Sequence, residues 1–219
     1  NALNTLRSRL PNDTCQAEVI HALAAWHREQ GGQYQRLGSE QWKWENRTAR
    51  ELCNEAIAKF PGSFGAKECA RLKAELEFPS LRIEAENAVA PNERSQVAVF
   101  YRNVERVGLR VVKDEVVDEP TEDRRDYEKW LAMQKPVREW TVELPDDGDL
   151  NEHMIEVPVD GLPLGRYAVL VATEGVFGKG NGSFAHAAFW STSFAVVQRT
   201  VNGSEELLVL DRNTGAAKS

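Results

Sequence analysis

Residues able to do chemistry are few in this chain, and their spacing matches no common metal motif. The four histidines are His21, His27, His153 and His186, and none lies in an HExxH or H-x3-H arrangement. His21 and His27 are six residues apart, which places them on different faces of a helix. The spacing therefore predicts structural or surface histidines and no bound metal.

Three aspartates, Asp146, Asp147 and Asp149, surround Gly148 in a polar stretch. A calcium loop needs a longer and more regular series of oxygen ligands that ends in glutamate. Aspartate beside glycine is typical of turns. We therefore predict a solvated turn here.

Motifs for nucleophilic or phosphate chemistry are also missing from the sequence. Residues 62–65 (Gly-Ser-Phe-Gly) lack the spacing of a GxSxG elbow and lie between two predicted helices. Gly178, Gly180 and Gly182 form a GxGxG string, but a strand pattern follows it where a phosphate loop needs a helix. The sequence predicts neither an enzyme nor a cofactor site.

Three cysteines, Cys15, Cys53 and Cys69, fall on apolar faces of predicted helices, where a free thiol behaves as a small hydrophobic side chain. The alternative is a bridge between Cys53 and Cys69, which flank the turn at Pro61 at similar distances along antiparallel helices. Such a bridge would indicate an oxidising compartment.

Six tryptophans are many for this length. Trp140 and Trp190 lie in strand patterns, which predicts core positions. Trp42, Trp44 and Trp130 lie in irregular polar surroundings. They are either partner contacts, for example a platform for a sugar or a peptide, or packing residues between helices and sheet.

Charge and length exclude further classes of protein. With 27 basic and 34 acidic residues the formal net charge is -7, which argues against nucleic-acid binding. No apolar run approaches the roughly 20 residues of a membrane span. The first residue is Asn1, so we expect that any leader or upstream domain has been removed.

Helical periodicity dominates residues 1–78, the first predicted segment. Apolar residues recur at helical spacing after Asp13, after Thr48 and after Ser63, each a candidate N-cap. Residues 49–61 read like the second helix of a tetratricopeptide unit, but no second copy follows about 34 residues on. The prediction is a helical hairpin with at least one more helix before it.

From residue 81 the period changes to two, which predicts antiparallel strands in a β-sandwich over residues 79–199. Residues 162–172 join a turn to a strand that is apolar on both faces. Gly165 and Tyr167 there predict a structural corner, in which the tyrosine hydroxyl bonds to the backbone just upstream. Residues 114–135 are expected to cross between sheets with a small apolar cluster.

Several short motifs resemble bacterial alpha-2-macroglobulin-like proteins. They are a Gly-x-Tyr strand at residues 165–167, a Ser-x-x-Phe strand at 191–194 and a Val-x-Asp-x-x-Thr-Gly stretch at 209–215. Residues 97–110 are similar to a strand and hairpin of that family, and residues 49–76 are loosely similar to its helical leader.

This resemblance implies an α+β multidomain chain. A helical segment (1–78) would precede an Ig-like, macroglobulin-type β-sandwich (79–199), and a following, truncated β-domain would begin at 200–219. The implied role is a non-enzymatic structural and interaction fragment of a large periplasmic or envelope protein whose relatives entrap proteases. Its partners would be neighbouring domains of the parent chain and proteases. The family's Cys-Gly-Glu-Gln thioester is absent from the sequence. The alternative is a carbohydrate- or peptide-binding sandwich.

Overall fold

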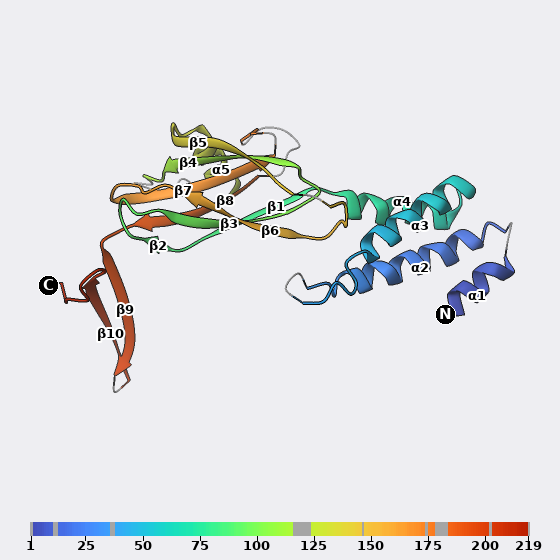
Figure 1. The fold of residues 1–219 in the computed structure, drawn as a ribbon, viewed down its shortest axis with the longest axis horizontal. Coiled ribbons are helices and arrows are strands. Elements are labelled where there is room, and N and C mark those ends of the chain that lie inside the picture. Colours follow the sequence, from blue (N-terminus) through green and yellow to red (C-terminus); the bar gives the residue numbers. More distant parts are fainter. Residues whose placement is uncertain are drawn as a thin grey trace. The chain divides into compact units, whose positions relative to one another are not determined.

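The computed structural model describes residues 2–10, 13–35, 38–115, 124–145, 147–173, 175–177, 184–201 and 203–218. It divides into two compact units (Figure 1). We call them the helical unit (Asn1–Ser80, Tyr101–Glu105 and Leu144–His153) and the β-unit (Leu81–Phe100, Arg106–Glu143 and Met154–Ser219). The predicted mixed α+β class is confirmed. Among the described helices, none has the length and apolar character needed to cross a membrane.

Four helices build the helical unit: α1 (Ala2–Arg9), α2 (Gln16–Gly31), α3 (Glu45–Lys59) and α4 (Phe64–Glu77). The apolar stripes of α2, α3 and α4 meet in one core, because residues three and four apart share a helix face, whereas α1 has no buried residue. The buried members of this core are Ile20, Ala24, Ala49, Cys53, Ala56, Cys69, Leu72, Leu76 and Leu150. The last of these comes from a distant loop, which the helical pattern does not reveal.

Only one of the three predicted helix caps has the expected geometry. The Ser63 hydroxyl accepts a hydrogen bond from the Ala66 amide, 3.3 Å away, at the start of α4. Thr48 is not a cap, because α3 begins three residues earlier and the Thr48 hydroxyl donates to the Trp44 carbonyl one turn back. Asp13 accepts from the Cys15 amide before α2 begins.

Two sheets carry most of the β-structure, and together they are compatible with a β-sandwich-like domain (Figure 1). One has the strand order β1 (Ser80–Ala85), β3 (Ser95–Arg102), β6 (His153–Val159). The other has the order β2 (Ala88–Val89), β8 (Phe184–Ser191), β7 (Gly165–Thr173), β4 (Arg106–Lys113), β5 (Pro136–Glu143). In the five-stranded sheet β4 pairs antiparallel with β5 and β7, and β7 with β8, whereas β2 pairs parallel with β8.

Strand β7 is buried on both faces, since its side chains from Tyr167 to Ala172 are at most 1% exposed. On one face Ala168 and Leu170 pack with Leu131 of helix α5 (Arg124–Met133). Tyr167 points to the other face, where its ring lies 6.0 Å from that of Phe189. The predicted apolar cluster in the crossover is thereby confirmed.

Gly165 and Tyr167 lie at the start of β7, as predicted, but the corner hydrogen bond is not seen. Gly165 has φ +154°, and a Cβ there would stand 3.3 Å from the Tyr167 ring. Tyr167 is 1% exposed. Within the described part of the chain no hydrogen bond of its hydroxyl is found, and the ring lies against Gly165 and Phe189. The prediction of a hydrogen bond from the Tyr167 hydroxyl to the upstream backbone is therefore wrong.

The strand pattern of residues 184–201 fits either one long strand or a kinked pair, and the structure has two strands, β8, which ends at Ser191, and β9 (Phe194–Val201). Strand β9 forms an antiparallel hairpin with β10 (Ser204–Asp211), in register from Val201 opposite Ser204 to Phe194 opposite Asp211. These two strands make a separate two-stranded sheet. That a further β-domain begins at 200–219 stays a prediction.

Candidate functional site

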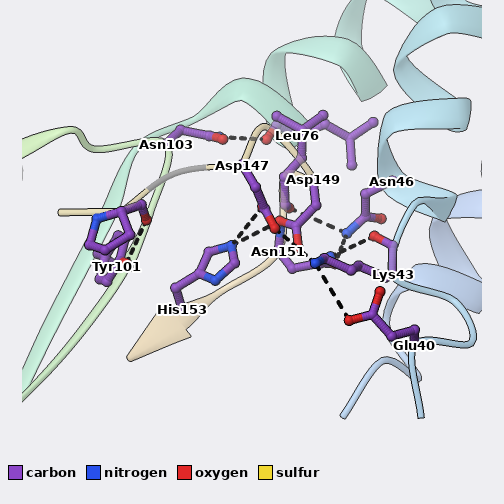
Figure 2. A network of polar contacts seen from close by, with 12 residues as sticks. Glu40, Lys43, Asn46, Leu76, Tyr101, Asn103, Asp147, Asp149, Asn151 and His153 are labelled. Atoms are coloured by element: carbon purple, nitrogen blue, oxygen red, sulfur yellow. Dashed lines mark hydrogen bonds and ion pairs between the residues drawn. The ribbon is translucent and has the colours of Figure 1, made fainter. Parts of the chain in front are cut away.

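Polar residues gather where a loop of the chain folds onto α3 of the helical unit (Figure 2). The loop spans Leu144–His153, and Leu150 at φ +65° lies in the helical core. The Asn46 amide holds the loop from the helix side. It donates to the Asn151 Oδ1, 2.9 Å away, and to the Leu150 carbonyl, 3.3 Å away.

Asn151 completes this attachment. Its Nδ2 donates to the Lys43 carbonyl at 2.8 Å, and its backbone N–H donates to the Asp149 Oδ1 at 2.8 Å. The second bond is a local Asx-type turn, which aspartate readily forms two residues before its donor. The turn directs the Asp149 side chain inward.

A cluster of two carboxylates and an imidazole results, which we call the Asp–His cluster (Asp147, Asp149 and His153). The His153 Nε2 lies 2.9 Å from the Asp149 Oδ1 and 3.7 Å from the Asp147 Oδ1. The Lys43 ammonium lies 2.9 Å from the Asp147 Oδ2 and 3.8 Å from a Glu40 oxygen. Figure 2 shows these side chains converging on one point of the loop.

Burial differs sharply between the two carboxylates. The Asp149 side chain is 0% exposed and that of Asp147 is 41% exposed. Burial acts to raise the pKa of Asp147, but the hydrogen bond and charge of Lys43 outweigh it and hold this pKa below its usual range. The same hydrogen bond raises the pKa of Lys43.

One oxygen of the buried carboxylate, the Asp149 Oδ2, has no hydrogen-bond partner among the described residues. A buried carboxylate oxygen without a partner is unfavourable, because it has lost water and gained nothing in exchange. One ligand atom from each member of the Asp–His cluster lies within 4.8 Å of the others. Two oxygens and one imidazole nitrogen are a donor set that divalent metals accept.

The sequence prediction of a solvated turn is therefore wrong for Asp149, and Asp146 lies outside the described residues. Sequence reasoning treated the aspartates and His153 separately. The available signal was the spacing Asp147-x-Asp149-x3-His153 at the junction of a turn and a strand. What the spacing could not show is that Asn46 and Asn151 turn this segment inward.

The three tryptophans predicted as contacts lie in different units. Trp42, at φ +72°, and Trp44, 43% exposed, belong to the helical unit, and Lys43 and Arg47 lie over the Trp44 ring. Trp130 belongs to the β-unit and packs beside Tyr127 in the cluster under α5. A role in binding sugar or peptide stays a prediction.

Trp190 was predicted as a core residue, which is wrong, since it is 53% exposed. It lies in β8 opposite Arg166, and the guanidinium carbon of Arg166 is 5.8 Å from the centre of its ring. A cation rather than apolar packing thus covers part of this side chain. The GxGxG string at 178–182 lies outside the described residues.

The prediction that the cysteines are buried free thiols is confirmed for two of the three. Cys53 and Cys69 are buried free thiols, so the bridge between them is not formed, whereas Cys15 is exposed and does not lie on an apolar face. A hydrogen bond with Cys69, together with burial, raises the pKa of Cys53. A buried thiol with a raised pKa, such as Cys53, is unreactive.

Comparison with known proteins gives neither a family nor a function. No protein-family model matches the chain, and no curated protein matches it. Two similar solved structures are of the CARDB domain of the PF1109 protein from Pyrococcus furiosus. A crystal structure in complex with di-metal ions has 17% identity and a TM-score of 0.31, and covers 52% of this chain and 94% of that chain. A solution NMR structure has 15% identity and a TM-score of 0.30, and covers 53% and 97%.

These findings contradict the resemblance to alpha-2-macroglobulin-like proteins. The solved structures are CARDB domains rather than macroglobulins, and no family model or curated protein supports the macroglobulin assignment. The short motifs that carried the resemblance occur in β7, β8, β9 and β10, where alternating apolar residues and turn residues are required by any antiparallel sheet. Protease entrapment and an envelope location followed from that resemblance alone.

Proposed function

We propose that this chain is a non-enzymatic interaction module. Its β9–β10 hairpin binds another protein molecule by pairing with a strand of that molecule. The observation that carries the proposal is the exposure of this hairpin's apolar side chains. In the proposal the two sheets of the β-unit form an Ig-like sandwich. Short antiparallel strands with inward alternation, such as Val97 and Val99 of β3, support this.

One face of the hairpin carries one pair that is apolar on both strands and one apolar member in each of the two neighbouring pairs. The register places Val196 opposite Val209, while Phe194 and Leu207 extend the same face. All four side chains are exposed, from 40% for Val209 to 66% for Leu207. An isolated two-stranded hairpin is marginally stable in water, and contiguous exposed apolar surface typically marks an interaction site.

The two edges of the hairpin differ. The outer edge of β10 is partly covered, because the Lys218 N–H donates to the Val209 carbonyl at 2.8 Å and Ala217 bridges to Leu210. Strand β9 pairs only with β10 among the described strands, which leaves its other edge available for addition of a strand.

A second copy of this chain fits the β9 edge. Strand β9 contains no acidic residue, and its one base, Arg199, is paired with Glu206 of β10 at 2.7 Å. Two β9 strands that pair antiparallel about Val197 place Arg199 opposite Ala195, so no like charges meet. This symmetric pairing makes a four-stranded sheet and joins the apolar faces of both hairpins.

Sedimentation velocity of the chain over a range of concentrations tests the proposal. We expect a monomer–dimer equilibrium that Val196→Lys weakens at least about tenfold, since a charge is then buried in the apolar face. Leu164→Lys is the matched control, because Leu164 and Val196 are both 64% exposed and Leu164 lies outside the hairpin. A chain that stays monomeric at several hundred micromolar, or equal effects of the two variants, would overturn the proposal.

A further inference from the structure

The Asp–His cluster and the neighbouring Glu40 together carry an excess of negative charge, and one of their carboxylates, that of Asp149, is fully buried. Glu40, Asp147 and Asp149 contribute three carboxylates, and among the described residues Lys43 is the one lysine or arginine that pairs with them. With a neutral imidazole the group therefore carries two uncompensated negative charges. The most buried of the three carboxylates, Asp149, also holds the oxygen without a partner.

From this we infer that Asp147, Asp149 and His153 bind one divalent transition-metal ion. The ion would neutralise the two excess charges and give the Asp149 carboxylate the partner that the described residues do not supply. It would act within the helical unit, since all three ligands belong to the loop Leu144–His153. This inference is independent of the hairpin's role.

Ligand spacing agrees with this inference. Around a metal with ligand distances of about 2.1 Å, neighbouring donor atoms in octahedral or tetrahedral geometry lie roughly 3.0–3.4 Å apart. The His153 Nε2 is 2.9 Å from the Asp149 Oδ1 and 3.7 Å from the Asp147 Oδ1, and all three ligand atoms lie within 4.8 Å of one another, so the Asp147 carboxylate has to move inward to complete the site. The exposed Asp147 side chain can make that adjustment.

The donor types select the metal. Calcium and magnesium bind through oxygen, whereas imidazole nitrogen favours zinc and the other first-row metals. Three protein ligands also leave at least one coordination position for water. Zinc is therefore the appropriate probe, with calcium as the contrasting ion.

Lys43 competes with the metal in this arrangement. Its ammonium lies 2.9 Å from the Asp147 Oδ2 and has to leave that oxygen, or tolerate a second cation beside it, when the metal binds. The backbone carbonyl of Lys43, which accepts from Asn151, does not depend on the side chain. Removing the ammonium should therefore strengthen metal binding while the attachment of the loop persists.

The test is calorimetric titration of the EDTA-treated, dialysed full chain with zinc chloride, and separately with calcium chloride. We expect one zinc ion per chain and much weaker calcium binding. Asp147→Asn and His153→Gln should each weaken zinc binding at least about tenfold. Asp160→Asn is the control, because Asp160 is an exposed carboxylate of the β-unit that pairs with Arg94.

Lys43→Met provides the sharper readout, since a merely structural role for the cluster predicts no tighter binding. We expect zinc affinity to rise several-fold in this variant. Circular dichroism of each variant confirms that it is folded. Absence of saturable zinc binding, affinity unchanged in both Asp147→Asn and His153→Gln, or an affinity not raised in Lys43→Met would overturn the inference.

Discussion

Among the described residues the side chains of two aspartates, Asp114 and Asp149, are completely buried, and their charges are compensated in different ways. Asp114 in the β-unit lies 3.0 Å from the Arg166 guanidinium and accepts a hydrogen bond from the Tyr127 hydroxyl at 2.7 Å. Asp149 in the helical unit has an imidazole, a backbone amide and a second carboxylate nearby. The charge of Asp114 is balanced by a cation. Asp149 is held by hydrogen bonds, and the carboxylates around it outnumber the cations.

The difference shows that burial of a carboxylate alone does not identify a binding site. Each of these aspartates has one oxygen without a hydrogen-bond partner among the described residues. Only around Asp149 do charge, donor type and spacing all favour an added cation. Asp114 is explained by its own partners, as expected for a structural ion pair.

Arg166→Met should have the largest effect on stability. It leaves Asp114 as an unpaired buried charge, which costs about 3 kcal/mol in free energy of unfolding. Lys43→Met removes the corresponding cation from the Asp–His cluster, but its partner Asp147 is partly exposed, so the unfolding midpoint should change little. Urea unfolding measures both, and equal losses would remove the distinction between the two sites.

Neutralising each buried aspartate gives the second comparison. Asp114→Asn should destabilise by about 2 kcal/mol, because two charge-assisted bonds are lost. Asp149→Asn, measured in EDTA, should cost less than about 1 kcal/mol, since relief of charge repulsion offsets the weaker bond to Asn151. A larger loss for Asp149→Asn would mean that its charge is already compensated.

The Tyr127 phenol allows a pH test of the Asp114 site. Burial, together with the hydrogen bond to Asp114, raises the pKa of Tyr127 above its ordinary value of 10.0. A group with a raised folded-state pKa gives its full stabilisation below the unfolded value, so this contribution is lost as the pH rises above about 10. Tyr127→Phe should abolish that part of the alkaline stability profile. A profile that the substitution leaves unchanged would contradict the assignment.

The smallest expected difference concerns one buried tyrosine of each unit. The Tyr101 hydroxyl donates to the Pro145 carbonyl at 2.6 Å, so Tyr101→Phe should cost about 1 kcal/mol. Tyr167→Phe should cost less than about 0.5 kcal/mol, because its ring contributes by packing. Thermal unfolding of the two variants measures both effects. A larger loss of stability for Tyr167→Phe than for Tyr101→Phe would support the predicted corner hydrogen bond.

Local pattern predicted much of the fold. Helical spacing located the stripes that contain Ile20 and Leu72, and the change of period at residue 81 located the first strands. The apolar faces of β7 correctly indicated a strand covered on both sides. These features are set by residues within one or two turns or by strand alternation, which a sequence displays directly.

The candidate site depends instead on contacts between residues far apart in the chain. Asn46 and Asn151 are separated by 105 positions, yet their bond fixes the loop that buries Asp149. Aspartates around a glycine are usually solvated turns, and local spacing does not reveal when a distant helix covers such a turn. The burial of Leu150 in the helical core also depends on contacts between distant residues, so the local sequence did not predict it.

That core position of Leu150 has a consequence for the order of events during synthesis. Helix α4 ends at Glu77, and about 70 further residues must be translated before Leu150 is made. At roughly 5–20 residues per second this takes several seconds, during which the helices have emerged but their core is incomplete. The helical unit therefore reaches its final packing only after most of the β-unit's first strands have left the ribosome.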